Sequence, residues 1–262
     1  SGDPEAGESV DLRRLRDRTA SLIAQLVSAQ DDNGGCPWCG RQKEVDPWTS
    51  AQVAWALGKA QADGVPVSDD ATKKLAAYLR KVFADVNPNE YELKAVVLHG
   101  LSWIGDVDFA HVNRLHRSRE NLSNAALGHL ALTFVRLERK SAAAEVLTVL
   151  RQRMSAGRGG AEKNWLSAER CSAWMNSPVE VSALALLAQL NVDPRAPEVV
   201  GVVNYLTELA RADGWRPHKA RGTILAALTT YYGRAEQQAA NYTVVVSVNG
   251  KDIGEMSSTD GK

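Results

Sequence analysis

The chain has 262 residues, of which 44% are hydrophobic and 24% charged, and its formal net charge at pH 7 is +0. A balanced charge carries no signature of nucleic-acid binding, and this length suffices for a sizeable hydrophobic core. The longest apolar runs, such as residues 179–190, are interrupted by polar residues and are shorter than the roughly 20 residues that a membrane span needs. We therefore expect a soluble globular protein with no membrane span in this chain.

The N-terminal segment, residues 1–11, has neither a basic start nor an apolar core, so we expect a linker there and no signal peptide in this chain. The cysteines are Cys36, Cys39 and Cys171, an odd number that does not by itself fix the redox compartment. Cys36 and Cys39 have the spacing of a thioredoxin-type motif. That motif belongs at a strand-to-helix junction in an α/β pattern, however, and no such pattern surrounds it.

Apolar residues recur at helical spacing along most of the chain, and Gly, Pro, Asn, Asp or Ser residues bound each segment. Ser68, Ser123 and Ser141 are predicted N-caps. Residues 155–177, which are rich in glycine, are predicted to form an irregular excursion or a small hairpin. The helices predicted in this way cover residues 12–30, 48–63, 69–86, 89–104, 108–117, 123–139, 141–154, 178–190, 197–211 and 219–232.

One pattern returns along these helices: a turn, a polar start and then an apolar stretch rich in small residues. It occurs at residues 46–57 and again at 177–187 and 221–228, which indicates stacked helical hairpins. The first helix of each hairpin is rich in Ala, Gly and Leu, and small residues allow helices to approach closely. We therefore predict an all-α fold, an α/α toroid or solenoid in which the first helices form an inner ring and the second helices lie outside.

After Asn241 the pattern becomes strand-like, with Tyr242-Thr-Val-Val-Val-Ser-Val248, the turn dipeptide Asn249-Gly250 and a second strand at residues 251–256. This predicts a short C-terminal β-hairpin. Two strands alone are only marginally stable. We accordingly divide the chain into a linker (residues 1–11), a helical toroid (12–240), and residues 241–262, which begin a following β-rich domain or dock on the helices.

The sequence contains five spaced motifs: Asp31-Asp-Asn-Gly-Gly35, Asp46-Pro-Trp-Thr-Ser50, Trp174-Met-Asn-Ser-Pro-Val-Glu180, Asp213-Gly-Trp-Arg-Pro-His-Lys-Ala220 and Tyr242-Thr-Val-Val-Val-Ser-Val-Asn-Gly250. Together they resemble bacterial alpha-2-macroglobulins, in particular their large extracellular alpha-helical proteins. The resemblance covers about residues 24–253. In that family this region is a thioester-containing helical toroid with the terpenoid cyclase and protein prenyltransferase fold, and a β-sandwich domain follows it.

The resemblance implies a domain of an endopeptidase inhibitor that traps proteases in a defence role. Cleavage of a bait segment releases a conformational change, and a Cys–Gln thioester then acylates the protease. The domain itself would not be an enzyme and would need no cofactor. Its partners would be other domains of the same chain and, transiently, target proteases. The protein would be exported to the periplasm, the cell surface or the medium.

The family's thioester motif, Cys-x-Glu-Gln, does not occur in this sequence. Cys39-Gly-Arg-Gln42 has the same Cys and Gln spacing, so Cys39 and Gln42 are a candidate thioester-like pair. A plain surface loop is the alternative, with a Cys36–Cys39 disulfide if the protein is exported. The family's toroid has about twelve helices, whereas about ten are predicted here. The missing pair, and the thioester with it, would then precede Ser1, unless this member lacks a thioester.

An isoprenoid-handling enzyme on the same fold is the rival hypothesis. A protonating cyclase needs an acidic cluster, and Asp106 and Asp108 supply only part of one; we expect Asp108 to cap a helix instead. Zinc-dependent prenyl transfer would need ligands such as Asp213, His218 and Cys171, but their spacing sets no ligand geometry. We therefore expect no metal site.

The histidines and tryptophans complete the candidates. We expect His99 and His129 to be hydrogen-bonded core residues, and His111, His116 and His218 to be solvated. Five tryptophans fall in loops or at helix starts, where they either form an aromatic interaction surface at one mouth of the toroid or plug the ends of the helical ring. These are Trp38, Trp48, Trp165, Trp174 and Trp215.

Overall fold

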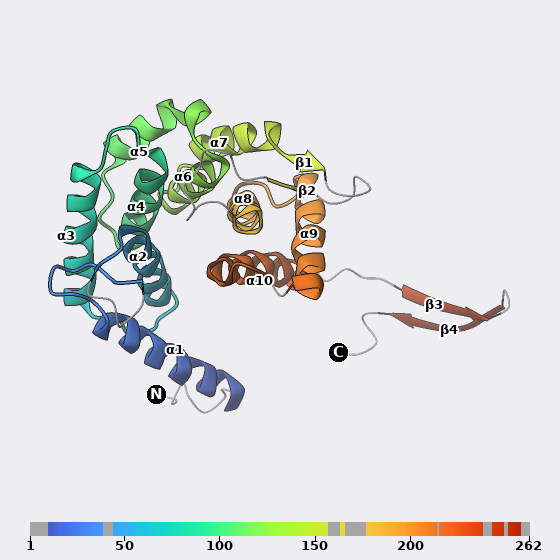
Figure 1. Cartoon of the computed structure of the whole chain (residues 1–262). Helices are drawn as coiled ribbons and strands as arrows, with labels where there is room; N and C mark the ends of the chain where they lie inside the picture. The colour runs from blue at the N-terminus through green and yellow to red at the C-terminus, as the bar shows by residue number, and fades with distance from the viewer. Residues whose placement is uncertain are drawn as a thin grey trace.

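The computed structural model describes residues 10–38, 44–156, 163–165, 177–213, 215–237, 243–248 and 251–257. These residues contain ten α-helices (Figure 1). Each predicted helix is present, with ends that differ by at most a few residues from the predicted ones. The helices are α1 (Val10–Ser28), α2 (Pro47–Ala62), α3 (Asp69–Asp85), α4 (Tyr91–Trp103), α5 (Phe109–Arg117), α6 (Asn124–Arg136), α7 (Lys140–Gln152), α8 (Pro178–Val192), α9 (Glu198–Asp213) and α10 (Arg221–Gln237).

The helices form an inner and an outer layer (Figure 1). Helices α2, α4, α6, α8 and α10 pack successively against one another around the centre. Helices α3, α5, α7 and α9 lie outside, each packed against the inner helix that precedes it in the chain. The predicted fold, an α/α toroid of helical hairpins with the small-residue helices inside, is confirmed.

The inner helices approach closely because glycine stands where two of them cross. A Cβ atom on Gly58 of α2 would lie 2.5 Å from the backbone oxygen of Trp103 of α4, and one on Gly100 of α4 would lie 2.6 Å from the backbone oxygen of Ala51 of α2. Real Cβ atoms essentially never come this close to another heavy atom. The two glycines therefore fix the separation of α2 and α4.

Replacement of Gly100 by Ala is expected to lower the free energy of unfolding by about 1–3 kcal/mol, because α2 must move away from α4. Gly233→Ala is the matched control, since nothing lies within 4 Å of the Cβ position there. The free energy of unfolding of this control should rise by up to about 1 kcal/mol, because alanine has a higher helix propensity than glycine. Urea unfolding followed by circular dichroism measures both changes, and equal stability of the two variants would contradict the close contact.

Most predicted helix starts are confirmed by their caps. The side chains of Ser68 and Ser123 accept hydrogen bonds from the backbone N–H groups of Ala71 and Ala126. The predicted cap at Ser141 is wrong, because α7 begins at Lys140. Glu138 has a left-handed φ of 59°, and the N–H of Arg139 donates to the oxygen of Phe134, so the chain turns and re-enters a helix before Ser141.

The strands form two antiparallel pairs. The strands β1 (Ser155–Ala156) and β2 (Lys163–Asn164) pair within residues 155–177, for which an irregular excursion or a small hairpin was predicted. The strands β3 (Thr243–Val248) and β4 (Lys251–Ser257) form the C-terminal hairpin, with a register shift between Val246 and Ser247. Asn249 and Gly250 lie outside the described residues. In Figure 1 the C-terminal hairpin lies apart from the helical ring.

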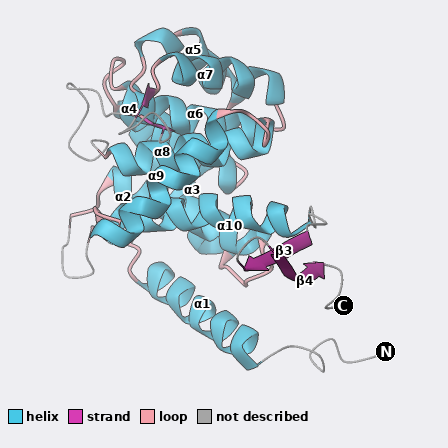
Figure 2. Cartoon of the chain, turned by 90° about the vertical axis from the view of Figure 1, so that its right-hand side faces the viewer, coloured by secondary structure: helices cyan, strands magenta, loops and turns pink. Residues whose placement is uncertain are grey.

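Helix α1 occupies the edge of the molecule. Figure 2 shows it beside the other helices, with its N-terminal end directed away from them. Its C-terminal part packs on α2, where Ile23 is buried. Across the described ranges, no helix has the length and apolar character needed to cross a membrane.

Candidate functional site: the cavity at the centre of the ring

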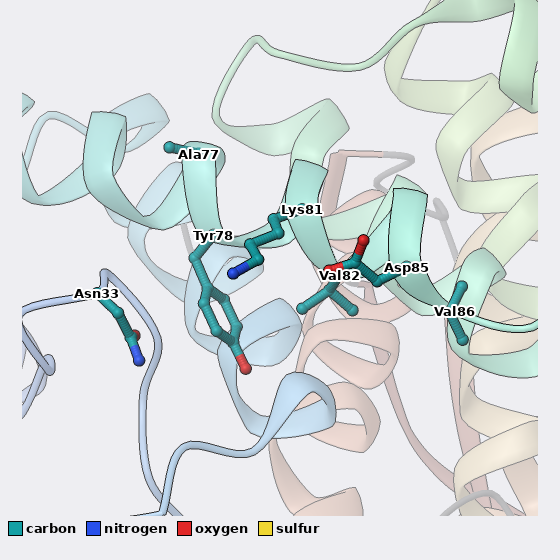
Figure 3. A pocket seen from close by; sticks show the side chains of 7 residues that line it. All are labelled: Asn33, Ala77, Tyr78, Lys81, Val82, Asp85 and Val86. Carbon is teal, nitrogen blue, oxygen red and sulfur yellow. The ribbon is translucent and has the colours of Figure 1, made fainter.

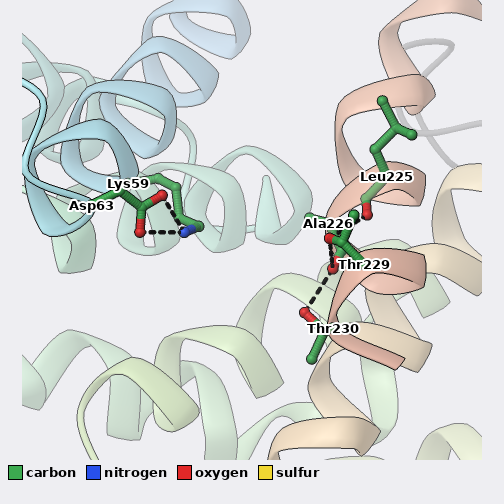
Figure 4. Close-up of polar contacts among 6 residues, drawn as sticks. All are labelled: Lys59, Asp63, Leu225, Ala226, Thr229 and Thr230. Carbon is green, nitrogen blue, oxygen red and sulfur yellow. Dashed lines mark hydrogen bonds and ion pairs between the residues drawn. The ribbon is translucent and has the colours of Figure 1, made fainter. Parts of the chain in front are cut away.

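A cavity of about 620 Å³ lies at the centre of the ring. Side chains of all five inner helices line it, so it is a product of the whole repeat array. Lys59 of α2 and Ala226, Thr229 and Thr230 of α10 line it from two sides (Figure 4). Its lining consists of Gln52, Trp55, Ala56, Lys59, His99, Trp103, Leu132, Val135, Arg136, Glu138, Leu187, Asn191, Lys219, Gly222, Thr223, Ala226, Thr229 and Thr230.

One wall of the cavity is aromatic. The ring centroids of Trp55 and His99 lie 4.6 Å apart, and the Arg136 guanidinium lies 4.7 Å from the centroid of the Trp103 ring. The cation is thus attracted to the negative face of the indole at the rim of the cavity. Neither Trp55 nor Trp103 was singled out from the sequence, because both fall inside helical patterns that are also typical of core residues.

Behind this wall, a chain of hydrogen bonds joins three rings. The Trp103 indole Nε1–H donates to His99 Nε2 over 3.1 Å, and the Nδ1 atoms of His99 and His129 are 3.0 Å apart. An indole can only donate, so His99 Nε2 is the acceptor and its proton is on Nδ1. That proton is donated to Nδ1 of His129, which therefore carries its own proton on Nε2. The geometry fixes both tautomers.

Both histidines are buried, which confirms the sequence prediction that they are hydrogen-bonded core residues. Burial lowers the pKa of His99 to about 3. Burial also lowers the pKa of His129 well below its ordinary value, and the nearby His99 and Lys219 act in the same direction. Both imidazoles are consequently neutral near pH 7, as the chain of hydrogen bonds requires.

A largely buried ion pair stands near the same histidines. Lys219 Nζ, from the short helical turn at His218–Ala220, donates to Glu180 Oε2 of α8. The Glu180 side chain is 9% exposed, whereas that of Lys219 is 19% exposed and lines the cavity. Burial raises the pKa of Glu180, and the charge of Lys219 partly offsets this. The pair links α8 to the chain entering α10.

The candidate thioester-like pair, Cys39 and Gln42, lies outside the described residues. The residues on either side of this segment are described, and Pro37 pairs with Val45 in an antiparallel bridge just before α2. Cys36 is buried, and this burial raises the pKa of its thiol to about 11. The backbone N–H of Cys36 donates to Ser50 Oγ over 2.8 Å. The flanking residues do not line the central cavity, and a pairing of Cys36 with Cys39 stays a prediction.

The predicted tryptophans lie on different parts of the ring. Trp165 is buried and its indole donates to the Leu150 oxygen of α7, whereas the half-buried Trp215 donates to the Leu206 oxygen of α9. Trp48 is half-buried at the start of α2, and Trp38 is 55% exposed. Trp174 lies outside the described residues. An aromatic interaction surface formed by these residues stays a prediction.

The two acidic candidates have structural explanations. Asp108 caps α5 by accepting from the N–H of Ala110, as predicted, and an Asp106 carboxylate oxygen lies 2.7 Å from an Arg80 nitrogen. Glu138 is the sole carboxylate among the described residues that line the cavity. The described part of the chain also contains no group of three His, Cys, Asp or Glu side chains suited to a metal ion. Cys171 lies outside that part.

One histidine assignment is wrong. His116 was expected to be solvated, yet its side chain is only 12% exposed, and its ring lies edge-on against Phe134 with centroids 5.0 Å apart. Burial lowers its pKa, and so does Arg119, while Glu145 acts in the opposite direction. The short helix α5 covers α6 with its apolar face, and this brings His116 inward with Leu115.

A second hollow lies on the outer side of the ring. Tyr78, Lys81, Val82 and Asp85 of α3 line it together with Asn33 of the loop that follows α1 (Figure 3). This surface is a shallow groove whose lining has no cluster of chemically reactive side chains. The central cavity is therefore the main candidate site of the described residues.

No protein-family model matches the sequence, and no curated protein matches it significantly. Solved structures do match this chain. Native alpha-2-macroglobulin from Escherichia coli, in a crystal structure spanning domain MG7 to the C-terminus, matches with a TM-score of 0.67 and 17% identity over 96% of this chain and 38% of that one. A cryo-EM structure of the native E. coli protein matches with a TM-score of 0.66 and 16% identity over 96% of this chain and 15% of that one.

Salmonella alpha-2-macroglobulin reacted with methylamine matches with a TM-score of 0.66 and 16% identity over 98% of this chain and 16% of that one. This chain thus spans less than two fifths of the length of each of these three structures. The match includes the helical ring, whose inner and outer layers were described above. The fold of this chain is accordingly the fold of a helical region of bacterial alpha-2-macroglobulins.

Proposed function

We propose that this chain is the helical, thioester-type domain of an alpha-2-macroglobulin-like endopeptidase inhibitor with a defence role. The observation that carries the proposal is the match of nearly the whole chain to alpha-2-macroglobulins from two bacteria. Three of these relatives' structures are described as activated by trypsin, activated by elastase or reacted with methylamine. The sequence motifs that resemble the same family give independent support.

In this proposal the chain is not an enzyme. Residues 12–240 form the domain that is released from the parent protein after bait cleavage, and residues 241–262 begin the next β-rich domain. The partners are other domains of the same chain and, transiently, the protease. Such a protein acts outside the cytoplasm, where a Cys36–Cys39 disulfide would persist.

A trapping assay tests the role. The full-length protein is incubated with trypsin, and residual activity is measured on a large and on a small substrate. Trapping predicts loss of activity towards the large substrate only, because the enclosed protease keeps its active site. The 262-residue chain alone is the control and should leave both activities unchanged. Unimpaired cleavage of the large substrate by trypsin mixed with excess full-length protein would reject the proposal.

Methylamine locates the thioester. Attack of the amine on the acyl carbon forms an amide bond and breaks the carbon–sulfur bond, which releases the cysteine as a thiol. Intact mass before and after treatment, combined with thiol alkylation, is measured for the 262-residue chain and for the full-length protein. We expect an adduct in the full-length protein only, with the thioester upstream. An adduct in the 262-residue chain would instead assign the reaction to Cys39 and Gln42.

The rival isoprenoid-handling enzyme receives limited support. Trp55 and Trp103 give the cavity an aromatic wall, but protonation of an alkene needs a neutral carboxylic acid held among its neighbours. Glu138, the carboxylate at the cavity rim, is exposed. The lining instead includes three cationic side chains, Lys59, Arg136 and Lys219. Turnover of an isoprenoid diphosphate by the 262-residue chain would favour this rival.

A further inference from the structure

The central cavity has the size and the charge of a site for a small anion. Its volume of about 620 Å³ lies within the range of about 300–1,000 Å³ that is usual for small-molecule sites. Three cationic side chains line it, those of Lys59, Arg136 and Lys219, whereas Glu138 is the sole carboxylate of its described lining. A hollow lined mainly by charges of one sign concentrates ligands of the opposite sign.

Arg136 is the cation that such a ligand would meet. Lys59 already pairs with Asp63, and Lys219 already pairs with Glu180. Arg136, in contrast, forms no ion pair within the described part of the chain. A guanidinium group is planar and can donate two parallel hydrogen bonds to one carboxylate. The lining thus favours a ligand with a single carboxylate group.

Trp103 holds this guanidinium in place. The Arg136 guanidinium lies 4.7 Å from the centroid of the Trp103 ring. The Trp103 indole N–H donates to His99, and His99 in turn contacts His129. Both imidazoles are buried, so the indole under the guanidinium has a fixed orientation. An anchor that is already ordered loses less conformational freedom when it binds a ligand.

Trp55 supplies an aromatic surface on the same wall. Its ring centroid lies 4.6 Å from that of His99, the residue that also accepts the hydrogen bond of Trp103. Trp55 is half-buried and lines the cavity, so part of its indole is accessible from there. Aromatic rings pack favourably on an indole in offset or edge-to-face geometry. The ring of a ligand bound to Arg136 would therefore find a matching surface.

The cavity also contains a buried hydroxyl group that has no partner. Thr223 of α10 lines the cavity and is only 4% exposed. No hydrogen bond within the described residues uses its hydroxyl group. Buried polar groups are normally paired with protein, water or a bound molecule. The partner of this hydroxyl group must therefore come from the contents of the cavity.

We propose that the central cavity binds a small aromatic carboxylate, with its carboxylate group on Arg136 and its ring against Trp55. A flat ring gains from contact with an indole face, which a flexible isoprenoid chain does not. A single carboxylate also suits the one cation that has no carboxylate partner among the described residues. The site does not depend on the protease-trap role, because that role assigns nothing to Arg136 or Trp55.

Equilibrium dialysis with 2-naphthoate tests the proposal on the full-length protein and on the 262-residue chain. Two related compounds are the controls: 2-naphthylmethanol lacks the charge, and decahydro-2-naphthoate keeps the charge but lacks the aromatic rings. We expect 2-naphthoate to bind about 10-fold more tightly than the alcohol, because only the acid forms charge-assisted hydrogen bonds. It should bind about 3-fold more tightly than the saturated acid, because only aromatic rings stack on Trp55.

Two arginine variants form a matched pair. Arg136 and Arg139 are both exposed and both lie over an aromatic ring, but Arg139 lies over Phe109 and does not line the cavity. Arg136→Gln should weaken the binding of 2-naphthoate about 10-fold, whereas Arg139→Gln should leave it unchanged. Arg136→Lys should have an intermediate effect, because an ammonium group keeps the charge but not the two parallel hydrogen bonds. Circular dichroism verifies that each variant keeps its helical content.

Four results would overturn the proposal. The first is no binding of 2-naphthoate at about 1 mM by either protein. The second is equal affinity for 2-naphthoate and 2-naphthylmethanol, since the cation would then play no part. The third is an equal effect of Arg136→Gln and Arg139→Gln. The fourth is binding by the 262-residue chain but not by the full-length protein, since other parts of that protein would then fill the cavity.

Discussion

Replacement of Lys219 by Met is expected to destabilise the fold by about 3–5 kcal/mol near pH 7.5, because it leaves the Glu180 carboxylate buried without its cation. Glu180→Gln should cost less. Lys219 lines the cavity, so water can solvate the ammonium group when the carboxylate is gone. Urea unfolding of the three proteins at pH 7.5 measures both effects. A larger decrease in the free energy of unfolding for Glu180→Gln than for Lys219→Met would contradict this account.

Two controls separate burial from charge. Lys59 and Asp63 form an exposed pair on α2, with side chains 50% and 56% exposed, so Lys59→Met should cost at most about 1 kcal/mol. The double variant Lys219→Met/Glu180→Leu removes both buried charges and should recover much of the lost stability.

In Lys219→Met the pKa of Glu180 rises further, so the folded variant takes up a proton more readily than the unfolded chain. The stability that Lys219→Met loses relative to the native chain should therefore become smaller as the pH falls from 7.5 towards 5.

The free energy of unfolding is expected to fall when the pH is lowered from 7.5 to 5. The pKa of His99 is lowered to about 3 in the fold, whereas that of an unfolded histidine is about 6.5. The contribution of His99 to the free energy of unfolding is complete above about pH 6.5 and is lost as the pH falls from there to about 3. At pH 5 the loss from His99 alone is about 2 kcal/mol. His129 and His116, whose pKa values are also lowered, act in the same direction.

Urea unfolding at pH 7.5, 6 and 5 measures this dependence. The raised pKa of Glu180 acts in the opposite direction, since the folded state then binds its proton more tightly than the unfolded state. The variant His99→Leu/His129→Leu removes the histidine contribution and should show a much flatter profile. If this variant does not fold, calorimetry of the native chain in two buffers gives the protons bound on unfolding. Net proton release on unfolding at pH 5.5 would show that the histidines do not dominate.

The helical ring could be predicted because its signals are local. Small residues at positions such as Gly58 and Gly100 distinguish inner helices, and Ser68, Ser123 and Asp108 mark helix starts through their own side chains. The error at Ser141 came from a competing turn at Glu138. The left-handed φ of Glu138 lets the next helix begin early, and no glycine stands at or beside this position to indicate such a turn.

The candidate site could not be predicted in the same way, because its residues meet only in the ring. Trp55, His99 and Lys219 come from α2, α4 and the turn before α10, and no local spacing connects them. The hydrogen bond between His99 and His129 spans 30 residues. The sequence did indicate that both histidines are in the core, but their contact depends on the angle at which α4 and α6 cross.

Successive packing of the inner helices also bears on how the molecule forms. Each inner helix rests on the one made just before it, so each hairpin finds its docking surface ready as the chain grows from N- to C-terminus. Contacts of this kind span short stretches of sequence and are associated with fast folding. A nascent chain would accordingly expose the apolar docking face of its newest inner helix only until the next hairpin emerges and covers it.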